Sequence, residues 1–471
     1  MKITNIFTLL LAYMLMTTFL FGQSNYSRIE ELISMLYNQQ QFNGTILVAE
    51  NGKITFKKSY GIANEENKKP IDENTIFELA SVSKQFTAMG IVILKERGKL
   101  SYEDKLTKFF PALDEYKDVT VRNLLAHTSG LPDYINPTRL QLLDQNKINK
   151  NDDIIEFLIK QKIQLSFPPG TKFSYSNTGY VLLASIIEKV SSETYADFLK
   201  RNVFKPLNMK NTFVYNRRLA PRTLDNYAYG YGYSEKENKY VLPDNEAKFV
   251  VFLDGIVGDG NISSTALDLL KWDQALRAGK LISKQGLQEL YNPAILNDGT
   301  QTKYGFGWFI GDNKDYGNYV YHSGGFPGYA TYIARYLTTN KTLIILQNHH
   351  GSVIPASSIT EILYNKPITK VYRKQIQLDE KRMERFIGEY RDKDDEQLVI
   401  TITRGNNYLV YNSTKHQNWN LRLFPESDKS FFAKNYEFQI EFATAEKGGI
   451  EIKLFEGGKA ISQAMKTRRA M

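Results

Sequence analysis

The chain has 471 residues, of which 42% are hydrophobic and 13% aromatic, and its formal net charge is +9. This length and apolar content predict two domains with sizeable cores, and the interleaving of acidic with basic residues leaves no stripe typical of nucleic-acid binding. The absence of cysteine excludes disulfides, thiolate metal sites and a cysteine nucleophile, and no H-x-x-x-H pair supports a zinc hydrolase.

The N-terminus is typical of a secretory signal peptide. Lys2 gives a positive start, residues 6–21 are apolar, and Gly22 is a small residue near an expected cleavage site. We therefore expect residues 1–23 to be removed and the mature protein to be periplasmic or secreted. The rival interpretation is an uncleaved membrane anchor, because the apolar run is long and lacks an A-x-A site. N-terminal sequencing of the mature protein distinguishes the two.

The first predicted elements are a helix and a hairpin. Residues 27–39 have apolar side chains at helical spacing, namely Ile29, Leu32, Ile33 and Leu36. Two alternating segments then flank Asn51-Gly52, a pair that tolerates the positive φ angles of a tight hairpin turn. An antiparallel sheet is therefore predicted to begin here.

Residues 77–98 are predicted to form a short lead-in and a helix whose first turn carries Ser81 and Lys84. The helix has a wide apolar face made by Phe86, Met89, Ile91, Val92 and Leu94, and Gly98 is the expected stop. Because residues three apart share a helix face, Lys84 can reach the Ser81 hydroxyl and help to activate it. A Ser-x-x-Lys string is also an ordinary helix opening, but it occurs once in this chain and precedes an apolar helix.

The middle of the chain is predicted to alternate helices with polar turns. Helices are expected at VRNLLA and over residues 151–161 and 178–190. Ahead of the last of these, FPPGTKFSYSNTGY places a Pro-Pro-Gly break before the turn Tyr175-Ser176-Asn177. Tyr-x-Asn also occurs at Tyr134 and Tyr316 and is a common polar turn. The placement of Tyr175 can aim its phenol, and the Asn177 amide, into a cleft.

The following segment completes a sheet made from both chain ends. Residues 226–240 are predicted to form a loop, and GDGNISSTALDLLKWDQAL a helix capped by Ser264 or Thr265 and running through Leu276. TKYGFGWFIGD, NYVYHSGGFPGYATYIARYL and TLIILQN predict three antiparallel strands, and residues 359–364 a final helix. The sequence therefore indicates an α/β domain: an antiparallel sheet flanked by helices, plus an all-helical lobe.

The sequence changes character at about residue 366. Residues 366–384 are polar and linker-like. Short alternating runs follow, separated by glycine-containing turns, at residues 398–403, 408–411, 421–424, 436–442, 450–455 and 460–465. This spacing predicts a small all-β barrel or sandwich without a catalytic constellation. The expected domains are thus residues 1–23, 24–365 and 385–471, with residues 366–384 as the linker.

A third candidate group is His322-Ser323-Gly324-Gly325, at the end of a predicted strand where glycines allow a substrate close to the backbone. Alone, this string more often marks a core or edge histidine. In order, Ser81-x-x-Lys84, Tyr175-x-Asn177 and His322-x-Gly324 resemble the serine β-lactamase and penicillin-binding-protein superfamily. The likeness is greatest to its class C-like branch of β-lactamases, esterases and D-amino-acid peptidases.

Flanking strings such as FELASVSKQFTA, LLAHTSGLPDY and GDGNISSTALDLLKW also fit this resemblance, which covers roughly residues 39–364. It implies a β-lactamase/transpeptidase-like fold and is specific for the superfamily rather than for a substrate. The C-terminal barrel resembles the lipocalin-like domains appended to some of these hydrolases.

The resemblance also implies roles for the candidate residues. Ser81 is the expected acylated nucleophile, Lys84 takes or relays its proton, and Tyr175 acts as base and then as acid. Asn177 is expected to bind the substrate, together with the backbone of residues 323–325. The oxyanion would lie between the N–H groups of Ser81 and Gly325.

His322 stands where lactamases of this branch carry lysine and where many esterase and peptidase relatives carry histidine. It is expected to donate to a substrate carboxylate or to Tyr175 while being only partly charged near neutral pH. This departure argues against efficient β-lactam hydrolysis.

The predicted function is that of an exported serine hydrolase acting on an ester, a D-amino-acid peptide or a β-lactam-type substrate. The expected partners are small molecules or peptides, without a metal, a cofactor or nucleic acid. One alternative is a penicillin-recognising binding or sensor protein that acylates and turns over poorly. A scaffold without chemistry is disfavoured, because drift would be expected to break at least one of Ser81, Lys84, Tyr175 and Asn177.

Overall fold

The computed structural model describes residues 24–234, 237, 239–244, 247–349, 353–434, 437–445 and 448–467. The expected signal peptide, residues 1–23, lies outside these described residues. No helix within the described ranges has both the length and the apolar character needed to span a membrane. The chain divides into two compact units, one formed mainly by residues up to Pro367 and the other mainly by residues from Ile368 onward.

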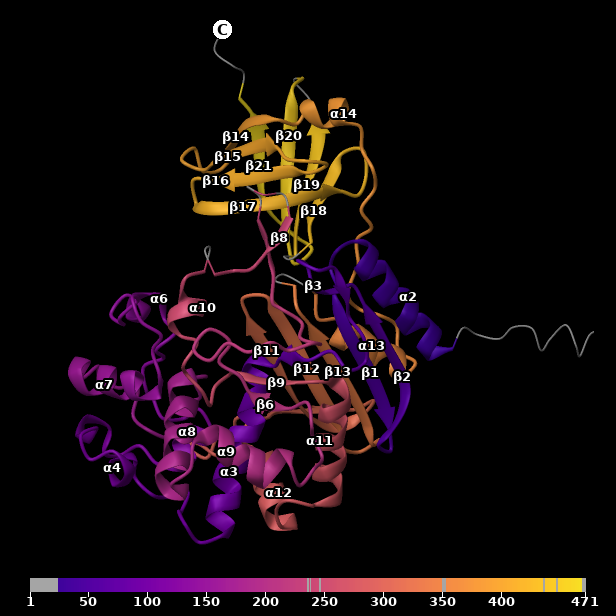
Figure 1. Cartoon of the computed structure of the whole chain (residues 1–471). Helices are drawn as coiled ribbons and strands as arrows, with labels where there is room; N and C mark the ends of the chain where they lie inside the picture. The colour runs from indigo at the N-terminus through magenta and orange to yellow at the C-terminus, as the bar shows by residue number, and fades with distance from the viewer. Residues whose placement is uncertain are drawn as a thin grey trace, which may run out of the picture. The chain divides into compact units, whose positions relative to one another are not determined.

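A six-stranded antiparallel sheet lies at the centre of the first unit (Figure 1). Its strand order is β10-β11-β12-β13-β1-β2. The bounds are β1 (Gly44–Glu50), β2 (Lys53–Tyr60), β10 (Phe309–Asn313), β11 (Gly317–Phe326), β12 (Tyr329–Tyr336) and β13 (Lys341–Gln347). β1 pairs with β13 from Gly44 opposite Gln347 to Glu50 opposite Lys341. The prediction of one sheet built from both chain ends is therefore confirmed.

The predicted helix at residues 27–39 and the hairpin that follows it are also confirmed. Helix α2 (Asn25–Asn38) buries the four apolar residues expected on one face: Ile29, Leu32, Ile33 and Leu36. Asn51 and Gly52 have φ angles of 50° and 75°, so both take the left-handed conformation that a two-residue hairpin turn requires.

The prediction of three C-terminal strands in this unit is wrong, because NYVYHSGGFPGYATYIARYL contains two strands. β11 and β12 pair from Tyr319 opposite Tyr336 to Phe326 opposite Tyr329. Gly328, with φ of 93°, makes the tight turn between them. A Cβ on Gly328 would lie 2.5 Å from the backbone of Gly230, so glycine is also required sterically.

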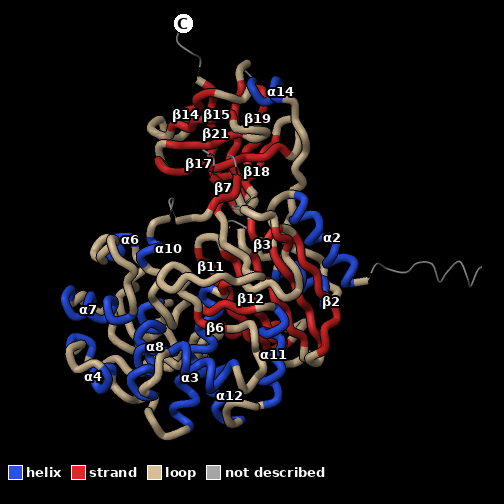
Figure 2. The backbone as a smooth tube through the Cα atoms, in the orientation of Figure 1, coloured by secondary structure: helices blue, strands red, loops and turns tan. Residues whose placement is uncertain are grey.

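The helices of the first unit gather largely into a lobe beside the sheet (Figure 2). Their bounds are α3 (Lys84–Glu96), α4 (Leu106–Phe109), α5 (Val121–Leu125), α6 (Pro137–Leu140), α7 (Asn151–Gln161), α8 (Asn177–Ser191), α9 (Tyr195–Leu199), α10 (Phe249–Phe252), α11 (Ala266–Ala278), α12 (Lys284–Tyr291) and α13 (Ala356–Leu363). α3 packs against α8 and α12, whereas α11 packs on β1 and β13 of the sheet. The predicted all-helical lobe is thus present.

Short strands and turns connect the lobe to the sheet. They are β3 (Ile62–Asn64) with β4 (Lys69–Pro70), β5 (Phe77–Glu78) with β9 (Ile262–Ser264) and β6 (Phe213–Val214), β7 (Gly232–Ser234) with β8 (Lys239–Val241), and the single turns η1 (Ala80–Ser83), η2 (Asp114–Tyr116) and η3 (Lys200–Phe204). The segment 226–240, predicted to be a loop, therefore contains β7 and the start of β8.

Of the two N-cap candidates for α11, Thr265 is the cap, because its side chain accepts a hydrogen bond from the Asp268 N–H.

The second unit contains a closed barrel of eight strands within its described residues. They are β14 (Gly388–Asp392), β15 (Val399–Arg404), β16 (Leu409–Ser413), β17 (His416–Pro425), β18 (Ser430–Ala433), β19 (Phe438–Thr444), β20 (Ile450–Glu456) and β21 (Lys459–Lys466), preceded by α14 (Glu380–Glu384). Pairing of β14 with β21 closes the barrel. The predicted all-β barrel is therefore confirmed, although β14 and β18 were not predicted as strands.

Candidate active site

Ser81 lies in the turn η1, between strand β5 and helix α3, and not in the α-helix as predicted. The α-helix begins at Lys84. Ala80 has a φ of 48°, a left-handed conformation that is uncommon for a residue with a side chain. This sharp bend directly before Ser81 turns the chain out of β5, and the resulting turn contacts β11 and β12. Local backbone strain of this kind is frequently found at functional sites.

The Lys84 amine connects three parts of the chain. Lys84 is completely buried, and its Nζ lies 3.1 Å from Ser81 Oγ, 2.8 Å from Asn177 Oδ1 and 2.8 Å from the Asp259 carbonyl oxygen. The two latter oxygens only accept hydrogen bonds, so they take two N–H groups of Lys84. The third position on Nζ faces the Ser81 hydroxyl. In the neutral amine this position is the lone pair, which can accept the hydroxyl proton.

Two consecutive residues of the loop after α5 hold the acceptors of Lys84 in place. Asn177 Nδ2 donates to Asp133 Oδ2 at 3.0 Å, which turns the amide so that its oxygen faces Lys84. The Tyr134 hydroxyl donates to Asp259 Oδ2 at 2.8 Å. Burial, and then the charge of Asp259, raises the pKa of Tyr134 well above its usual value, so the phenol stays protonated as a donor.

Tyr175 lies in the same site, with its ring centroid 4.9 Å from Lys84 Nζ. Its hydroxyl is buried and has no hydrogen-bond partner among the described residues. On the other side, the ring packs against His127, with centroids 4.2 Å apart. Most buried hydroxyl groups are satisfied, so an unsatisfied phenol beside a serine–lysine pair indicates a group kept free for a bound molecule.

His322 differs from the sequence-based expectation. It is 1% exposed, with Nε2 3.1 Å from the Tyr304 hydroxyl and Nδ1 2.7 Å from the Ser323 carbonyl oxygen. Burial, and then the nearby Lys84 charge, lowers the pKa of His322 to about 3, so the ring is neutral. Nδ1 then donates to Ser323 and Nε2 accepts from Tyr304. Both nitrogens are engaged, and the ring centroid lies 6.1 Å from that of Tyr175, so His322 does not donate to Tyr175 or present a cation.

The glycines after His322 bring strand β11 against the serine turn. A Cβ on Gly324 would lie 2.3 Å from the Leu79 carbonyl oxygen and 3.1 Å from the Ser81 nitrogen. A Cβ on Gly325 would meet no atom within 4 Å, and both Gly325 and Ser323 are exposed. The backbone after Gly324 therefore borders open space directly beside Ser81, where a substrate carbonyl could be placed.

The structure places Ser81, Lys84 and Asn177 in direct contact, with the Tyr175 ring and strand β11 beside them. It also adds residues that the sequence analysis did not single out. Asp133 and Tyr134 lie in the quoted string LLAHTSGLPDY, but no role was assigned to them. His127 and Tyr304 pack around Tyr175 and His322. Burial, and then the Lys84 charge, lowers the pKa of His127 well below its usual value. Within the described ranges, no cluster of three or more acidic or histidine side chains could hold a metal ion.

Comparison with known proteins agrees with this geometry. A family profile described as Beta-lactamase matches residues 29–361. Penicillin-binding protein 4* of Bacillus subtilis (strain 168) is 40% identical over 456 residues, which cover 95% of this chain and 100% of that protein. The octameric penicillin-binding protein homologue from Pyrococcus abyssi has a similar fold, with a TM-score of 0.64 and 24% identity over 93% of this chain and 99% of that one.

A further similar structure is the D-amino acid amidase from Ochrobactrum anthropi SV3 in complex with D-phenylalanine. Its TM-score is 0.58 and its identity 25%, and the match covers 71% of this chain and 98% of the amidase.

Proposed function

The chain belongs to the Beta-lactamase family, and on this premise we propose that it is a serine hydrolase in which Ser81 forms an acyl-enzyme. The observation that carries the proposal is the 3.1 Å contact between Lys84 Nζ and Ser81 Oγ. Lys84 is buried and its other contacts are fixed by acceptors. An amine held in this way can receive a proton from the one hydroxyl that faces it.

In the acylation step, the Ser81 proton moves to the Lys84 amine as Oγ attacks the substrate carbonyl carbon. The carbonyl oxygen becomes an oxyanion that the N–H groups of Ser81 and Gly325 stabilise. One such donor typically contributes about 2.7–4 kcal/mol of transition-state stabilisation. The free phenol of Tyr175 then donates a proton to the leaving group as the tetrahedral intermediate collapses.

Deacylation reverses these roles. A water molecule attacks the Ser81 ester and gives a proton to the Tyr175 oxygen that protonated the leaving group, and the Ser81 oxygen takes its proton back from Lys84 as it leaves. Asn177 holds Lys84 and also lies where it can bind the amide or side chain of the acyl group. Ser81, Lys84 and Asn177 come from η1, α3 and α8, and the packing of α3 on α8 keeps them together. Tyr175 lies two residues before α8, and Gly325 lies in β11.

The proposed substrates are esters and D-amino-acid amides or peptides. A relative of known structure is named a D-amino acid amidase and holds D-phenylalanine, which supports this class. The neutral, buried His322 supplies no positive charge for a substrate carboxylate at that position. Efficient β-lactam hydrolysis is therefore less favoured than hydrolysis of an uncharged ester or amide.

A second candidate function is that of a penicillin-binding protein that acylates and releases the product slowly. The relative with 40% identity carries this description in its name. We also propose that residues 1–23 direct export to the periplasm or the medium, that residues 24–365 form the hydrolase domain and 366–384 a linker, and that residues 385–471 form an appended domain. N-terminal sequencing of the exported protein tests the first of these statements.

The proposed function is tested with p-nitrophenyl acetate and with benzylpenicillin. Replacement Ser81→Ala should lower ester turnover by at least about 1,000-fold, because the attacking atom is removed. Ser101→Ala, at an exposed serine outside the site, is the matched control and should behave as the wild type. Intact-protein mass spectra with benzylpenicillin should show a Ser81-dependent adduct if acylation occurs, and its lifetime separates a hydrolase from a binding protein. Full turnover by Ser81→Ala would disprove the assignment.

A further inference from the structure

A second pocket lies beside strand β6, and none of the groups around Ser81 lines it. Its volume is about 520 Å³, within the range of small-molecule sites. The charged residues of its lining are Lys200, Lys205, Lys210, Arg222 and Asp197, so basic side chains outnumber acidic ones four to one. Strand pairing separates it from the nucleophile: Ser263 of β9 pairs with Phe213 of β6 on one side and with Glu78 of β5 on the other. Strand β6, beside the pocket, is thus two strand spacings, or about 10 Å, from strand β5, which leads to Ser81.

The basic side chains of this pocket have no acidic partner. None of the four takes part in an ion pair found within the described residues. Asp197 Oδ2 instead accepts a bond from the Thr194 hydroxyl at 2.8 Å, at the start of α9. The pocket lining therefore carries an excess of positive charge, with four basic side chains and one acidic one.

Asp268, a buried acid that binds the segment leading into β6, is also engaged elsewhere. One Asp268 carboxylate oxygen accepts from the Asn211 N–H at 2.8 Å and from the Thr212 hydroxyl at 3.0 Å. The other oxygen is bound by Lys271 at 2.7 Å. These bonds fix the loop that leads into β6. They leave Asp268 unable to neutralise the lysines of the pocket.

Arg222 is held in one orientation by two aromatic rings. Its guanidinium carbon lies 4.2 Å from the centroid of Phe213 and 4.8 Å from that of Tyr215. The Tyr215 hydroxyl also donates to the Arg222 carbonyl oxygen at 3.0 Å, which ties the backbone to the same ring. A guanidinium stacked in this way keeps its N–H edge available for an anion, and less side-chain entropy is lost on binding.

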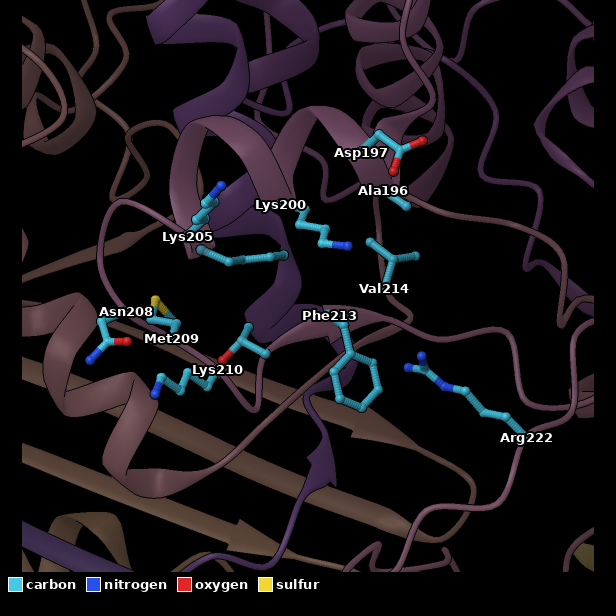
Figure 3. A pocket seen from close by; sticks show the side chains of 12 residues that line it. Ala196, Asp197, Lys200, Lys205, Asn208, Met209, Lys210, Phe213, Val214 and Arg222 are labelled. Atoms are coloured by element: carbon cyan, nitrogen blue, oxygen red, sulfur yellow. The ribbon is translucent and has the colours of Figure 1, made fainter.

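Lys200 and Arg222 extend from different sides toward the space beside Phe213 and Val214 (Figure 3). Two like charges that converge without a counter-ion repel each other, and an anion bound between them removes that repulsion. Phe213 and Val214, which are both only partly buried, provide the apolar surface of the pocket. The pocket thus combines a pair of cations with an apolar wall.

An alternative explanation for these basic side chains is that they are ordinary solvated residues at the end of a helix. Lysines at the C-terminal end of a helix interact favourably with its dipole, and this accounts for Lys200 and Lys205 at and after η3. It does not account for Lys210 or Arg222, which lie outside helices, or for the stacking of Arg222 on Phe213. The helix dipole therefore explains only half of the positive charge.

We propose that this pocket binds a small organic anion, a phosphate or carboxylate carried on an apolar group. The anionic group lies between Lys200 and Arg222, where the guanidinium can donate two parallel hydrogen bonds, and the apolar group packs on Phe213 and Val214. The site is separate from the Ser81 site and does not depend on its chemistry. It gives the protein a second ligand of a different class from the acyl substrate.

The test uses phenylphosphonate, benzoate and inorganic phosphate as probes of the full-length protein, with binding measured by isothermal titration calorimetry. Phenylphosphonate should bind saturably at one site and more tightly than inorganic phosphate, because the ring adds apolar contact. Benzoate in the second arm shows whether the site prefers a carboxylate or a phosphate. Affinity should fall as salt is raised, since charge attraction drives binding.

Variants that remove one charge from the pocket test whether the probe binds there. Arg222→Gln and Lys200→Gln should each weaken phenylphosphonate binding by about tenfold, as expected for the loss of one charged hydrogen bond. Lys280→Gln, at an exposed lysine outside the pocket, is the matched control and should bind as the wild type. All variants should keep wild-type ester turnover, which also shows that they are folded. Absence of saturable binding, or unchanged binding by the Lys200→Gln/Arg222→Gln double variant, would overturn the proposal.

Discussion

At the scale of single residues, the arrangement around Lys84 depends on two side chains that do not touch the nucleophile. Asp133 holds the Asn177 amide, and Tyr134 holds Asp259. Because Asn177 and Asp259 supply the acceptors for Lys84, the loop residues determine which way the amine points. Asp133 and Tyr134 are therefore positioning residues in the proposed mechanism.

The replacement Asp133→Ala should lower kcat for p-nitrophenyl acetate by about tenfold, which corresponds to about 1.4 kcal/mol. Without the carboxylate, the Asn177 amide can turn its N–H₂ toward Lys84, where two donors oppose each other. KM should change less than kcat, because the substrate does not contact Asp133.

The conservative variant Asp133→Asn retains an acceptor oxygen for Asn177 and should recover most of kcat. Asp152→Ala, at an exposed aspartate of α7, controls for the loss of a carboxylate. A wild-type kcat in Asp133→Ala would show that the loop does not position Lys84.

The buried, neutral His322 makes the free energy of unfolding depend on pH. Its pKa is lowered from 6.5 to about 3 in the folded protein, so the unfolded chain binds the proton more readily. Stability from this residue is therefore fully present above about pH 6.5 and is lost as the pH falls toward 3. Between pH 7 and pH 5 the loss is about 2 kcal/mol for one buried neutral histidine. The lowered pKa values of His127 and His349 act in the same direction.

This prediction is checked by urea unfolding at pH 7 and pH 5, for the wild type and for His322→Asn. The asparagine variant is expected to be less stable at pH 7 but to lose about 2 kcal/mol less between the two pH values. An equal pH dependence for the two proteins would mean that His322 is not buried as a neutral ring.

At the scale of elements, the site depends on the close approach of strand β11 to the turn η1. Gly324→Ala should lower ester turnover by about 100-fold or more, because its Cβ would lie 2.3 Å from the Leu79 carbonyl oxygen. To relieve this clash, β11 must move away from Ser81, which displaces the Gly325 N–H. Gly232→Ala, where a Cβ meets no atom within 4 Å, is the control. Near-normal turnover in Gly324→Ala would show that the strand position is not critical.

Elements with strong local signals were predictable from the sequence. Helices α7 and α8 and the Asn51-Gly52 hairpin have caps, periodicity or turn residues that act over a few positions, and they match within one or two residues. The strand pair β11 and β12 was merged into one strand, because both sides of its turn are rich in aromatic and β-branched residues. Strands β14 and β18 were missed because they are five and four residues long and carry little alternation.

For the site, the sequence predicted the residues whose motifs are local, and it missed partners that only the fold brings together. Ser81 and Lys84 are three residues apart, so a single helical turn, which is η1 in the structure, is enough to bring them together. Tyr134 and Asp259 are 125 residues apart, and no local pattern reports their bond. Likewise, the charge of His322 could not be read from its motif, because it depends on burial by surrounding elements.

At the scale of the whole molecule, the site and the barrel have separate cores. Every residue placed in the proposed mechanism belongs to the first unit. The barrel has its own interior, in which the Phe386 and Phe442 rings stack at 4.0 Å and Phe431 packs against both at 5.5 Å. Each unit therefore has a hydrophobic core that does not need the other for its packing.

A chain that ends at Pro367 should consequently keep ester hydrolysis, with kcat for p-nitrophenyl acetate within about threefold of the full chain, because separate domain cores fold as units. Circular dichroism and a cooperative thermal transition would establish that the shortened chain is folded. Retained kcat would place the chemistry in the first unit alone and leave the barrel a role in binding or localisation. A folded but inactive shortened chain would show instead that the barrel contributes to the working site.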